Sequence, residues 1–241
     1  MVVTDGCCVF LREGAVLTSD RTITALEAQK RHAERVNVYL DGEYAFGLPA
    51  ILAAHLRVGQ RLTEAEIDAL RQSDAVERAT DRAVRLLARR PYSVAELRRY
   101  LANKKTPDAV IAVALTKLER LGYVDDRAFA AYWIENREHF RPRGLRALRY
   151  ELRQKGIAAD VIEAALQEVD PRASALRAAQ SRVRRLRGLK RREARSKLAG
   201  FLQRRGFAYA VVREVVAEVL DELETTQPDY FAEDTDGTNT T

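Results

Sequence analysis

The sequence predicts a mainly α fold, in which three tandem three-helix repeats form an elongated, curved array behind a small α+β domain. The first observation behind this prediction is self-similarity at a period of about 50 residues. The second is the helical spacing of the apolar residues inside each copy. The third is a strand pattern confined to the N-terminal part of the chain. The most regular columns of the repeat hold leucine: Leu97, Leu148 and Leu198 in one, and Leu101, Leu152 and Leu202 in the other.

Strand signals lie within residues 21–73, where we expect the small α+β domain. Residues 36–40 alternate between apolar and polar side chains, which is the period of a half-buried strand. Asp41-Gly42 follows, and a further β-type run comes after it. This dipeptide is a strong signal for a two-residue hairpin turn. Residues 1–20 show no clear period, and we expect them to be disordered.

The repeats are expected over residues 75–123, 124–170 and 171–223. Three short helices bury little apolar surface alone, so each unit is expected to stack on the next. Residues 224–241 follow the third repeat. They are rich in acids, and we expect an acidic, disordered tail there.

Helix boundaries inside the repeats carry capping signals. Ser93 with Glu96 matches the capping box at the start of a helix. Asp170-Pro171 places a capping acid before a proline at the first helical position. Gly156 and Gly206 follow the middle helices of their repeats, where a left-handed residue commonly ends a helix.

The first helix of the second and third repeats carries an apolar stripe at helical spacing. Trp133 lies in one of these stripes, and an exposed aromatic ring of this kind would stack on nucleic-acid bases. Its spacing favours the alternative, a residue of the helical core. The two stripes are Phe129, Trp133, Asn136 and Phe140 in the second repeat, and Leu176, Ala179, Val183 and Leu186 in the third.

Charge is distributed unevenly along the 241 residues, although the net charge is only +6. Arg172 to Arg213 contains fourteen Lys or Arg residues and one acid, and the chain from Glu214 onward contains nine acids and no base. Such a basic block attracts polyanions, phosphate backbones above all. The acidic end shields the block or is simply solvated, and the second reading is the simpler.

Composition and termini suggest a cytoplasmic protein. No apolar run approaches the roughly 20 residues that span a bilayer, so we expect no membrane association. The N-terminus lacks the features of a secretory signal. Cys7 and Cys8 are adjacent and form neither a disulfide framework nor a metal site, which indicates reduced thiols.

Little in the sequence suggests catalysis, so we predict a binding protein, not an enzyme, with no cofactor and no metal. The histidines lie apart, and the common zinc and nucleotide motifs are missing. Asp125-Asp126 is the best candidate for a Mg²⁺ site of a nuclease. Adjacent helical residues point about 100° apart, however, and these acids open a helix. Capping is therefore the preferred interpretation.

Basic residues recur at equivalent repeat positions and are the best candidates for binding a nucleic acid or a filament. One column holds Arg90, Arg141 and Arg191, and another holds Lys104, Lys155 and Arg205. Stacked repeats would align each column into a track of positive charge. Because the second column falls at helix C-termini, helix-dipole complementation is an alternative explanation for it. It does not explain the crowding of Arg182, Arg184, Arg185, Arg187, Lys190, Arg191 and Arg192.

These motifs together resemble the bacterial RecX regulatory proteins. The similarity covers roughly residues 75–223, and its most specific parts are Arg90-Pro91-Tyr92-Ser93, the run from Leu118 to Ala130, and Arg141-Pro142-Arg143-Gly144. Residues 21–73 are similar to the N-terminal extension of longer family members.

The resemblance implies a modulator of the RecA recombinase that lodges in the groove of the RecA–DNA filament. It implies inhibition of ATPase, strand-exchange and coprotease activities, in DNA repair, recombination and the SOS response. Family resemblance brings no catalytic residues. We expect a monomer that binds RecA filaments and, weakly and non-specifically, DNA. The alternative is a general or helix-turn-helix-like protein acting on duplex DNA, which predicts sequence-selective binding.

Overall fold

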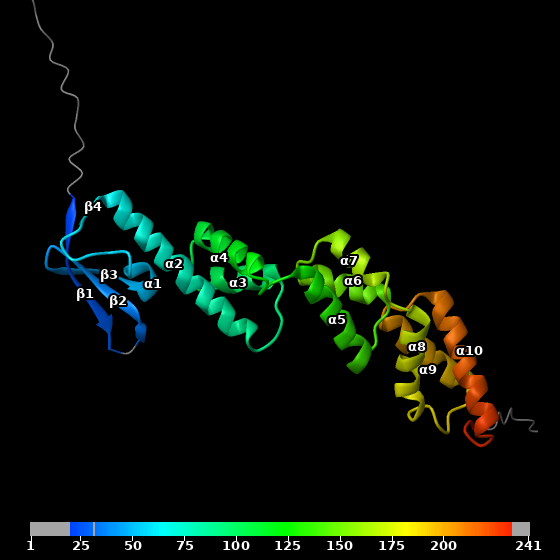
Figure 1. Cartoon of the computed structure of the whole chain (residues 1–241). Coiled ribbons are helices and arrows are strands. Elements are labelled where there is room, and N and C mark those ends of the chain that lie inside the picture. Colours follow the sequence, from blue (N-terminus) through cyan, green and yellow to red (C-terminus); the bar gives the residue numbers. More distant parts are fainter. Residues whose placement is uncertain (1–19, 31, 233–241) are drawn as a thin grey trace, which may run out of the picture. The chain divides into compact units, whose positions relative to one another are not determined.

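In the computed structural model of the chain, residues 20–30 and 32–232 are described (Figure 1). The chain divides into two compact units between Ala79 and Thr80, inside the long helix α2 (Glu64–Leu87). The predicted fold class is confirmed: the chain is mainly helical, and three three-helix units follow, in the sequence, a small domain that contains strands. We expected residues 1–20 to be disordered and Cys7 and Cys8 to be reduced. All of these residues except Asp20 lie outside the described part of the chain.

The N-terminal unit is a four-stranded antiparallel sheet packed with α1 (Ala50–Ala53) and the start of α2. Asp41 and Gly42 have φ values of 53° and 88°, so the predicted hairpin turn is present between Leu40 and its partner Glu43. Ile23, Val38, Leu40 and Leu48 are fully buried, with the first turns of α2 beside them. The strands, in the order β3-β2-β1-β4, are β1 (Arg21–Gln29), β2 (His32–Leu40), β3 (Glu43–Pro49) and β4 (Arg61–Leu62).

The first repeat combines the second half of α2 with α3 (Val94–Asn103) and α4 (Asp108–Arg120). Ser93 and Glu96 form the predicted capping box, with the Glu96 amide donating to Ser93 Oγ at 3.1 Å. Leu97 and Leu101, one turn apart on α3, are fully buried, as the leucine columns require.

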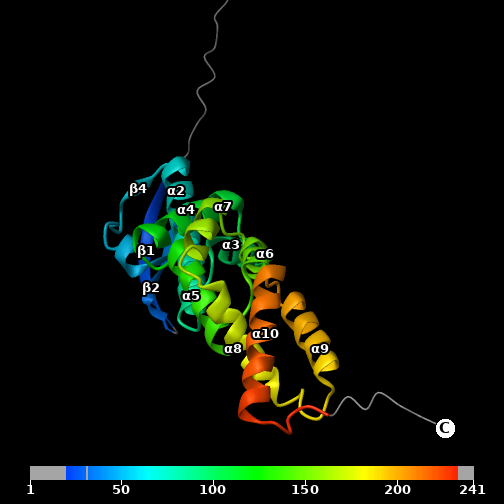
Figure 2. The same cartoon turned by 90° about the vertical axis from the view of Figure 1, so that its right-hand side faces the viewer.

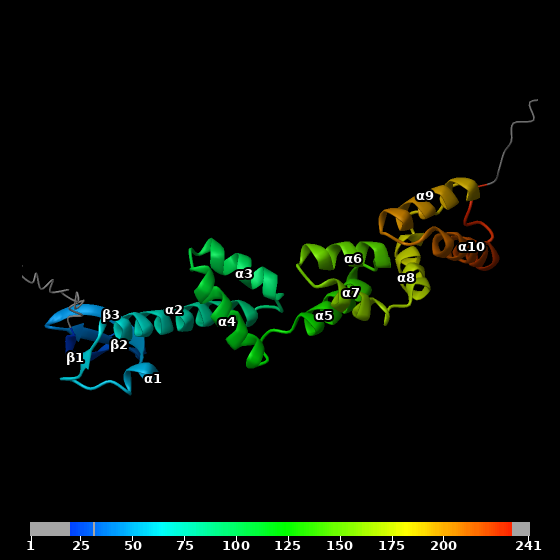
Figure 3. The same cartoon turned by 90° about the horizontal axis from the view of Figure 1, so that it is seen from above.

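The second repeat consists of α5 (Asp126–Phe140), α6 (Leu145–Gln154) and α7 (Ala159–Leu166), which lie together in Figure 3. Its core includes Phe129, and the ring of Trp133 packs against that core, as the stripe predicted. Phe140 is different, because it is 70% exposed at the end of α5. The helical stripe continues one turn beyond the surface that α6 and α7 cover.

The third repeat consists of α8 (Pro171–Val183), α9 (Arg191–Arg204) and α10 (Tyr209–Thr226), which pack against each other (Figure 2). Ala179 and Leu186 of the predicted stripe are buried, and Leu176 and Val183 border the core. Asp170 caps α8 through hydrogen bonds from the amides of Arg172 and Ala173, ahead of Pro171.

Order extends further toward the C-terminus than the sequence suggested. The predicted tail at residues 224–241 begins too early, because α10 runs to Thr226 and Tyr230 is 3% exposed. The Tyr230 carbonyl accepts from the Gly188 amide at 3.0 Å, and the Ala232 amide donates to the Leu189 carbonyl at 3.1 Å. The remainder of the expected tail, from residue 233, lies outside the described residues.

Candidate functional site

The first two repeats meet where the start of α3 contacts the end of α6. Ser93 Oγ donates to the carbonyl oxygen of Lys155 at 2.7 Å, and Lys155 Nζ lies 2.7 Å from Glu96 Oε1. Burial alone would raise the pKa of Glu96, but hydrogen bonds from Lys155 and Arg90 hold that pKa below its ordinary value. This carboxylate is therefore ionised and shared between two cations at the junction.

Asp126 strengthens the same junction from α5. Its Oδ1 accepts from the Val94 amide at 2.9 Å, at the beginning of α3. Burial raises the pKa of Asp126, the Val94 amide lowers it, and the charge of Asp125 raises it further. Asp125 itself caps α5, accepting from the Arg127 and Ala128 amides. The two carboxylates thus serve different helices, as two N-terminal contacts and not as one metal site.

The second and third repeats meet in the same way, one repeat further along the chain. Gly144, which precedes α6 as Ser93 precedes α3, donates its amide to the carbonyl of Arg205 at 3.0 Å. Arg205 also donates to the Pro142 carbonyl at 3.1 Å. Gly206 approaches so closely that a Cβ on it would lie 2.6 Å from the Ala147 Cβ. Both junctions therefore join the start of one middle helix to the end of the next.

The first predicted column of basic residues is only partly regular. Arg90 precedes α3, lies 3.2 Å from Glu96 and covers the Tyr92 ring at 3.6 Å from its centroid. Arg141 is exposed at the C-cap of α5. Arg191 occupies the first turn of α9 instead of the loop before it, because α9 begins one turn earlier relative to its buried leucines. It is paired with Asp221 and Glu224.

The second predicted column is regular, since Lys104, Lys155 and Arg205 are the C-cap residues of α3, α6 and α9. Lys104 is exposed beside Tyr100. The other two are used within the chain: Lys155 pairs with Glu96 and Arg205 bonds to the Pro142 carbonyl. Two members of the track thus hold the repeats together.

The crowded basic cluster lies at the end of α8, in the following loop and at the start of α9. Arg182 covers the Phe201 ring at 5.1 Å, and Arg205 lies 4.5 Å from the centroid of the same ring. Burial lowers the pKa of Arg205, and the charges of Arg143, Arg141 and Arg182 lower it further. The cluster is exposed except for Arg182 and Arg191, which are half-buried: Arg182, Arg184, Arg185, Arg187, Lys190, Arg191 and Arg192.

Sequence reasoning missed Glu151, Arg137 and Arg143. Glu151 accepts from Trp133 Nε1 at 2.9 Å and from Arg137 Nε at 2.6 Å, and it lies 3.6 Å from Arg143 Nε. Trp133 therefore packs against the core while its indole N–H is satisfied by an acid from α6. The signal available in the sequence was an acid on the partly buried side of α6, which has no counterpart in the other repeats.

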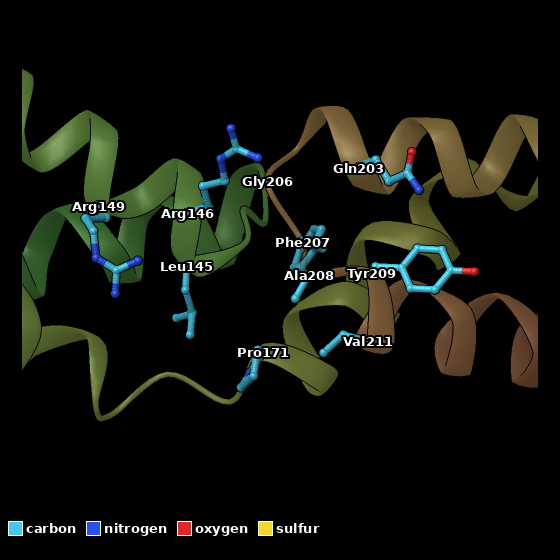
Figure 4. Close-up of a pocket in the computed structure, with 10 residues that line it drawn as sticks. All are labelled: Leu145, Arg146, Arg149, Pro171, Gln203, Gly206, Phe207, Ala208, Tyr209 and Val211. Atoms are coloured by element: carbon cyan, nitrogen blue, oxygen red, sulfur yellow. The ribbon is translucent and has the colours of Figure 1, made fainter.

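A hollow of about 540 Å³ lies at the junction of the second and third repeats (Figure 4). Arg146 and Arg149 border it from α6, and Tyr209 borders it from the third repeat. Arg149 is held by Glu163 at 2.6 Å, whereas Arg146 is exposed. The apolar wall is formed by Leu145, Pro171, Phe207, Ala208 and Val211.

Within residues 20–30 and 32–232, no group of three or more His, Cys, Asp or Glu side chains is placed to hold a metal ion. No helix found there has the length and apolar character needed to cross a bilayer.

Four family models match consecutive parts of the chain. The regulatory protein RecX N-terminal domain matches residues 21–63. The first, second and third three-helix domains of RecX match residues 79–118, 125–166 and 168–216.

Comparison with whole proteins gives the same family. The regulatory protein RecX of Bacillus pumilus is 33% identical over 204 residues, which is 83% of this chain and 78% of the relative. That of Clostridium botulinum is 31% identical over 83% of this chain and 96% of its own length. A crystal structure of a regulatory protein RecX superposes with a TM-score of 0.68 at 29% identity, covering 81% of this chain and 98% of that one. RecX from Lactobacillus salivarius, with a TM-score of 0.56 at 20% identity over 62% of this chain and 99% of its own, shares the fold.

Proposed function

Since this chain belongs to the RecX family of regulatory proteins, we propose that it binds the RecA recombinase in its DNA filament and inhibits it. The inhibited activities are ATP hydrolysis, strand exchange and coprotease stimulation. The protein acts in the cytoplasm as a monomer without catalysing a reaction, and it touches DNA weakly and without sequence preference.

The observation that carries this proposal is the set of basic side chains in the third repeat that lie outside the ion pairs of the described residues. Arg172 and Arg191 are paired with acids of α10. The exposed cations Arg184, Arg185 and Arg187 lie outside every ion pair of the described residues. Like charges at this density repel, so an anionic partner lowers their free energy. A filament that displays phosphates along its groove is such a partner.

The proposal is tested by ATP turnover of RecA on single-stranded DNA. Adding the protein in excess lowers the turnover rate. The triple variant Arg184→Glu, Arg185→Glu, Arg187→Glu needs at least about tenfold more protein for the same effect, because opposite charge lowers the association rate and the affinity. The matched control, Arg98→Glu, Arg120→Glu, Arg127→Glu, has the same net charge, and its three sites are exposed cations of the first and second repeats. It inhibits more strongly than the first variant.

Two results would contradict the proposal. The first is unchanged turnover with excess wild-type protein and active RecA. The second is sequence-selective retention of duplex DNA in gel shifts at two salt concentrations, which would favour the duplex-binding alternative.

A further inference from the structure

The second and third repeats differ in how they compensate the charge of an equivalent arginine on their first helix. In the second repeat, the arginine twelve residues after the helix cap Asp125 is Arg137, and Glu151 neutralises it at 2.6 Å. The same carboxylate lies 3.6 Å from Arg143. One acid on the middle helix thus compensates two guanidinium groups.

In the third repeat the corresponding acid is replaced by a phenylalanine. Arg182 lies twelve residues after the cap Asp170 and is the counterpart of Arg137. The position of Glu151, one turn before the C-cap of the middle helix, holds Phe201. Arg182 and Arg205 cover its ring at 5.1 and 4.5 Å from the centroid. Over the described residues, neither arginine lies within ion-pair distance of a carboxylate.

A hollow of about 440 Å³ opens beside Arg182 and is lined by residues of α8, of the loop that follows it and of α9. Lys197 at its edge is paired with Glu193 at 2.6 Å. The guanidinium groups of Arg185 and Arg204, like that of Arg182, have no carboxylate partner in the described parts of the chain. The lining residues are Arg182, Arg185, Leu186, Ser196, Lys197 and Arg204.

We propose that this hollow is a phosphate-binding site that takes phosphodiester groups of a nucleic-acid backbone. Arginine forks match phosphate oxygens bidentately, and Ser196 supplies a hydroxyl donor beside them. The opening faces solvent at exposed Arg185 and Arg204, so a continuous strand has access to it. Burial lowers the pKa of Arg205, and the charges of Arg143, Arg141 and Arg182 lower it further, as expected where cations gather. This assignment rests on the proposed function and deepens it, because it states which group of the filament the third repeat takes.

The test uses the full chain and a fluorescent thymidine oligonucleotide, with anisotropy read at several salt concentrations and without RecA. The variant Arg182→Gln, Arg204→Gln binds about tenfold more weakly near 0.1 M salt. Its slope of log affinity against log salt falls by about 1.4, since two phosphate contacts are lost. The variant Arg182→Lys, Arg204→Lys restores the slope but only part of the affinity, because lysine keeps the charge and loses the fork.

The matched control is Arg120→Gln, Arg213→Gln, which removes the same charge at exposed sites outside the hollow. An equal loss of affinity in this control overturns the proposal in favour of diffuse charge. A second variant, Phe201→Glu, supplies the carboxylate that the second repeat has in Glu151. It weakens oligonucleotide binding about as much as Arg182→Gln, Arg204→Gln does, while circular dichroism shows a folded chain. Wild-type affinity in that folded variant also overturns the proposal.

Two further measurements distinguish phosphate from protein carboxylates as the bound anion, and distinguish failure of the site from failure of the proposed function. Inorganic pyrophosphate displaces the oligonucleotide if phosphate alone is recognised, and failure to displace it at millimolar concentrations overturns the assignment. If Arg182→Gln, Arg204→Gln leaves oligonucleotide affinity intact but abolishes the effect on RecA turnover, the cluster binds protein acids and the site is refuted. If oligonucleotide binding behaves as expected while wild-type protein leaves RecA turnover unchanged, the site stands and the proposed function fails.

Discussion

Glu96 shows how much one side chain contributes at the residue scale. It completes the cap of α3, accepts from Lys155 of the next repeat and lies beside Arg90. Its side chain is 11% exposed, so its interactions are weakly screened by solvent. A local helix cap and a contact between repeats therefore depend on the same carboxylate.

Glu96→Gln is expected to lower the free energy of unfolding by about 1–3 kcal/mol at pH 7, because Lys155 is left half-buried without a counter-ion. The pKa of Glu96 is lowered in the folded state, so its stabilisation is complete above the ordinary glutamate value, about 4.3. That stabilisation disappears as pH falls through the lowered value. Urea unfolding at several pH values measures the difference. Glu119→Gln, at an exposed position, serves as control, and equal losses in both variants would contradict the expectation.

Asp126→Asn is expected to change the free energy of unfolding in the direction opposite to Glu96→Gln, or not to lower it. The pKa of Asp126 is raised by burial, so its ionised form carries a cost that is lost as pH falls through the raised value. Asparagine keeps the oxygen that accepts from the Val94 amide without the charge. We expect unchanged or higher stability at pH 7, and an advantage that shrinks toward acidic pH. Asp126→Ala removes the acceptor and costs about 1–3 kcal/mol. Thermal unfolding at two pH values distinguishes them, and a destabilised Asp126→Asn would contradict this account.

Elements and their caps were largely predictable, because caps and turns are local. Ser93, Asp170 and the Asp41-Gly42 turn behave as the sequence indicated. Phe140 was placed in the core because helical period alone cannot show where a neighbouring helix ends. The contact of Asp126 with Val94 spans 32 residues, and no local pattern encodes it.

The junction between α6 and the end of α9 allows a test at the element scale. Gly144 has φ −73°, which alanine adopts freely, yet its Cβ would lie 2.2 Å from the Gly206 carbonyl oxygen. Gly144→Ala is therefore expected to cost about 2 kcal/mol or more through overpacking against backbone. Gly200→Ala, inside α9, meets only the flexible end of Arg204 at 3.2 Å. It is expected to stabilise by about 0.5–1 kcal/mol. Denaturant midpoints measure both changes in stability. If both variants shift the midpoint in the same direction, the close packing of Gly144 against Gly206 does not decide the outcome.

At the scale of the whole molecule, the sequence shows how charge is distributed along the chain, but it does not show which basic residues are paired within the fold. The basic residues at helix C-caps were found by their register. Their contacts within the chain could not be predicted from sequence, because the partners of Lys155 and Arg205 lie about 60 residues away along the chain. Sequence therefore identified the basic third repeat. Only the packing of α8, α9 and α10 separates the paired Arg172 and Arg191 from the arginines that have no carboxylate partner in the described residues.

Removing residues 233–241 deletes Glu233, Asp234 and Asp236 and no base. We expect this truncation to tighten oligonucleotide binding about two- to threefold at low salt, and to have no effect near 1 M salt, where charges are screened within about 3 Å. Anisotropy titrations measure the change. Replacing the three acids by their amides in the full chain should reproduce it. Tightening that persists at high salt would exclude charge as the cause.

The segment from Gln227 to Ala232 gives the third repeat a property that the other two lack. In the first and second repeats, the residue that caps the middle helix receives the following repeat. In the third, Lys190 occupies that position and is bridged to Ala232, with Tyr230 buried beside it. The position that receives the following repeat in the first two units is therefore covered by the chain's own residues 227–232. A repeat whose end is covered by its own chain exposes less apolar surface there than one that needs a neighbouring unit.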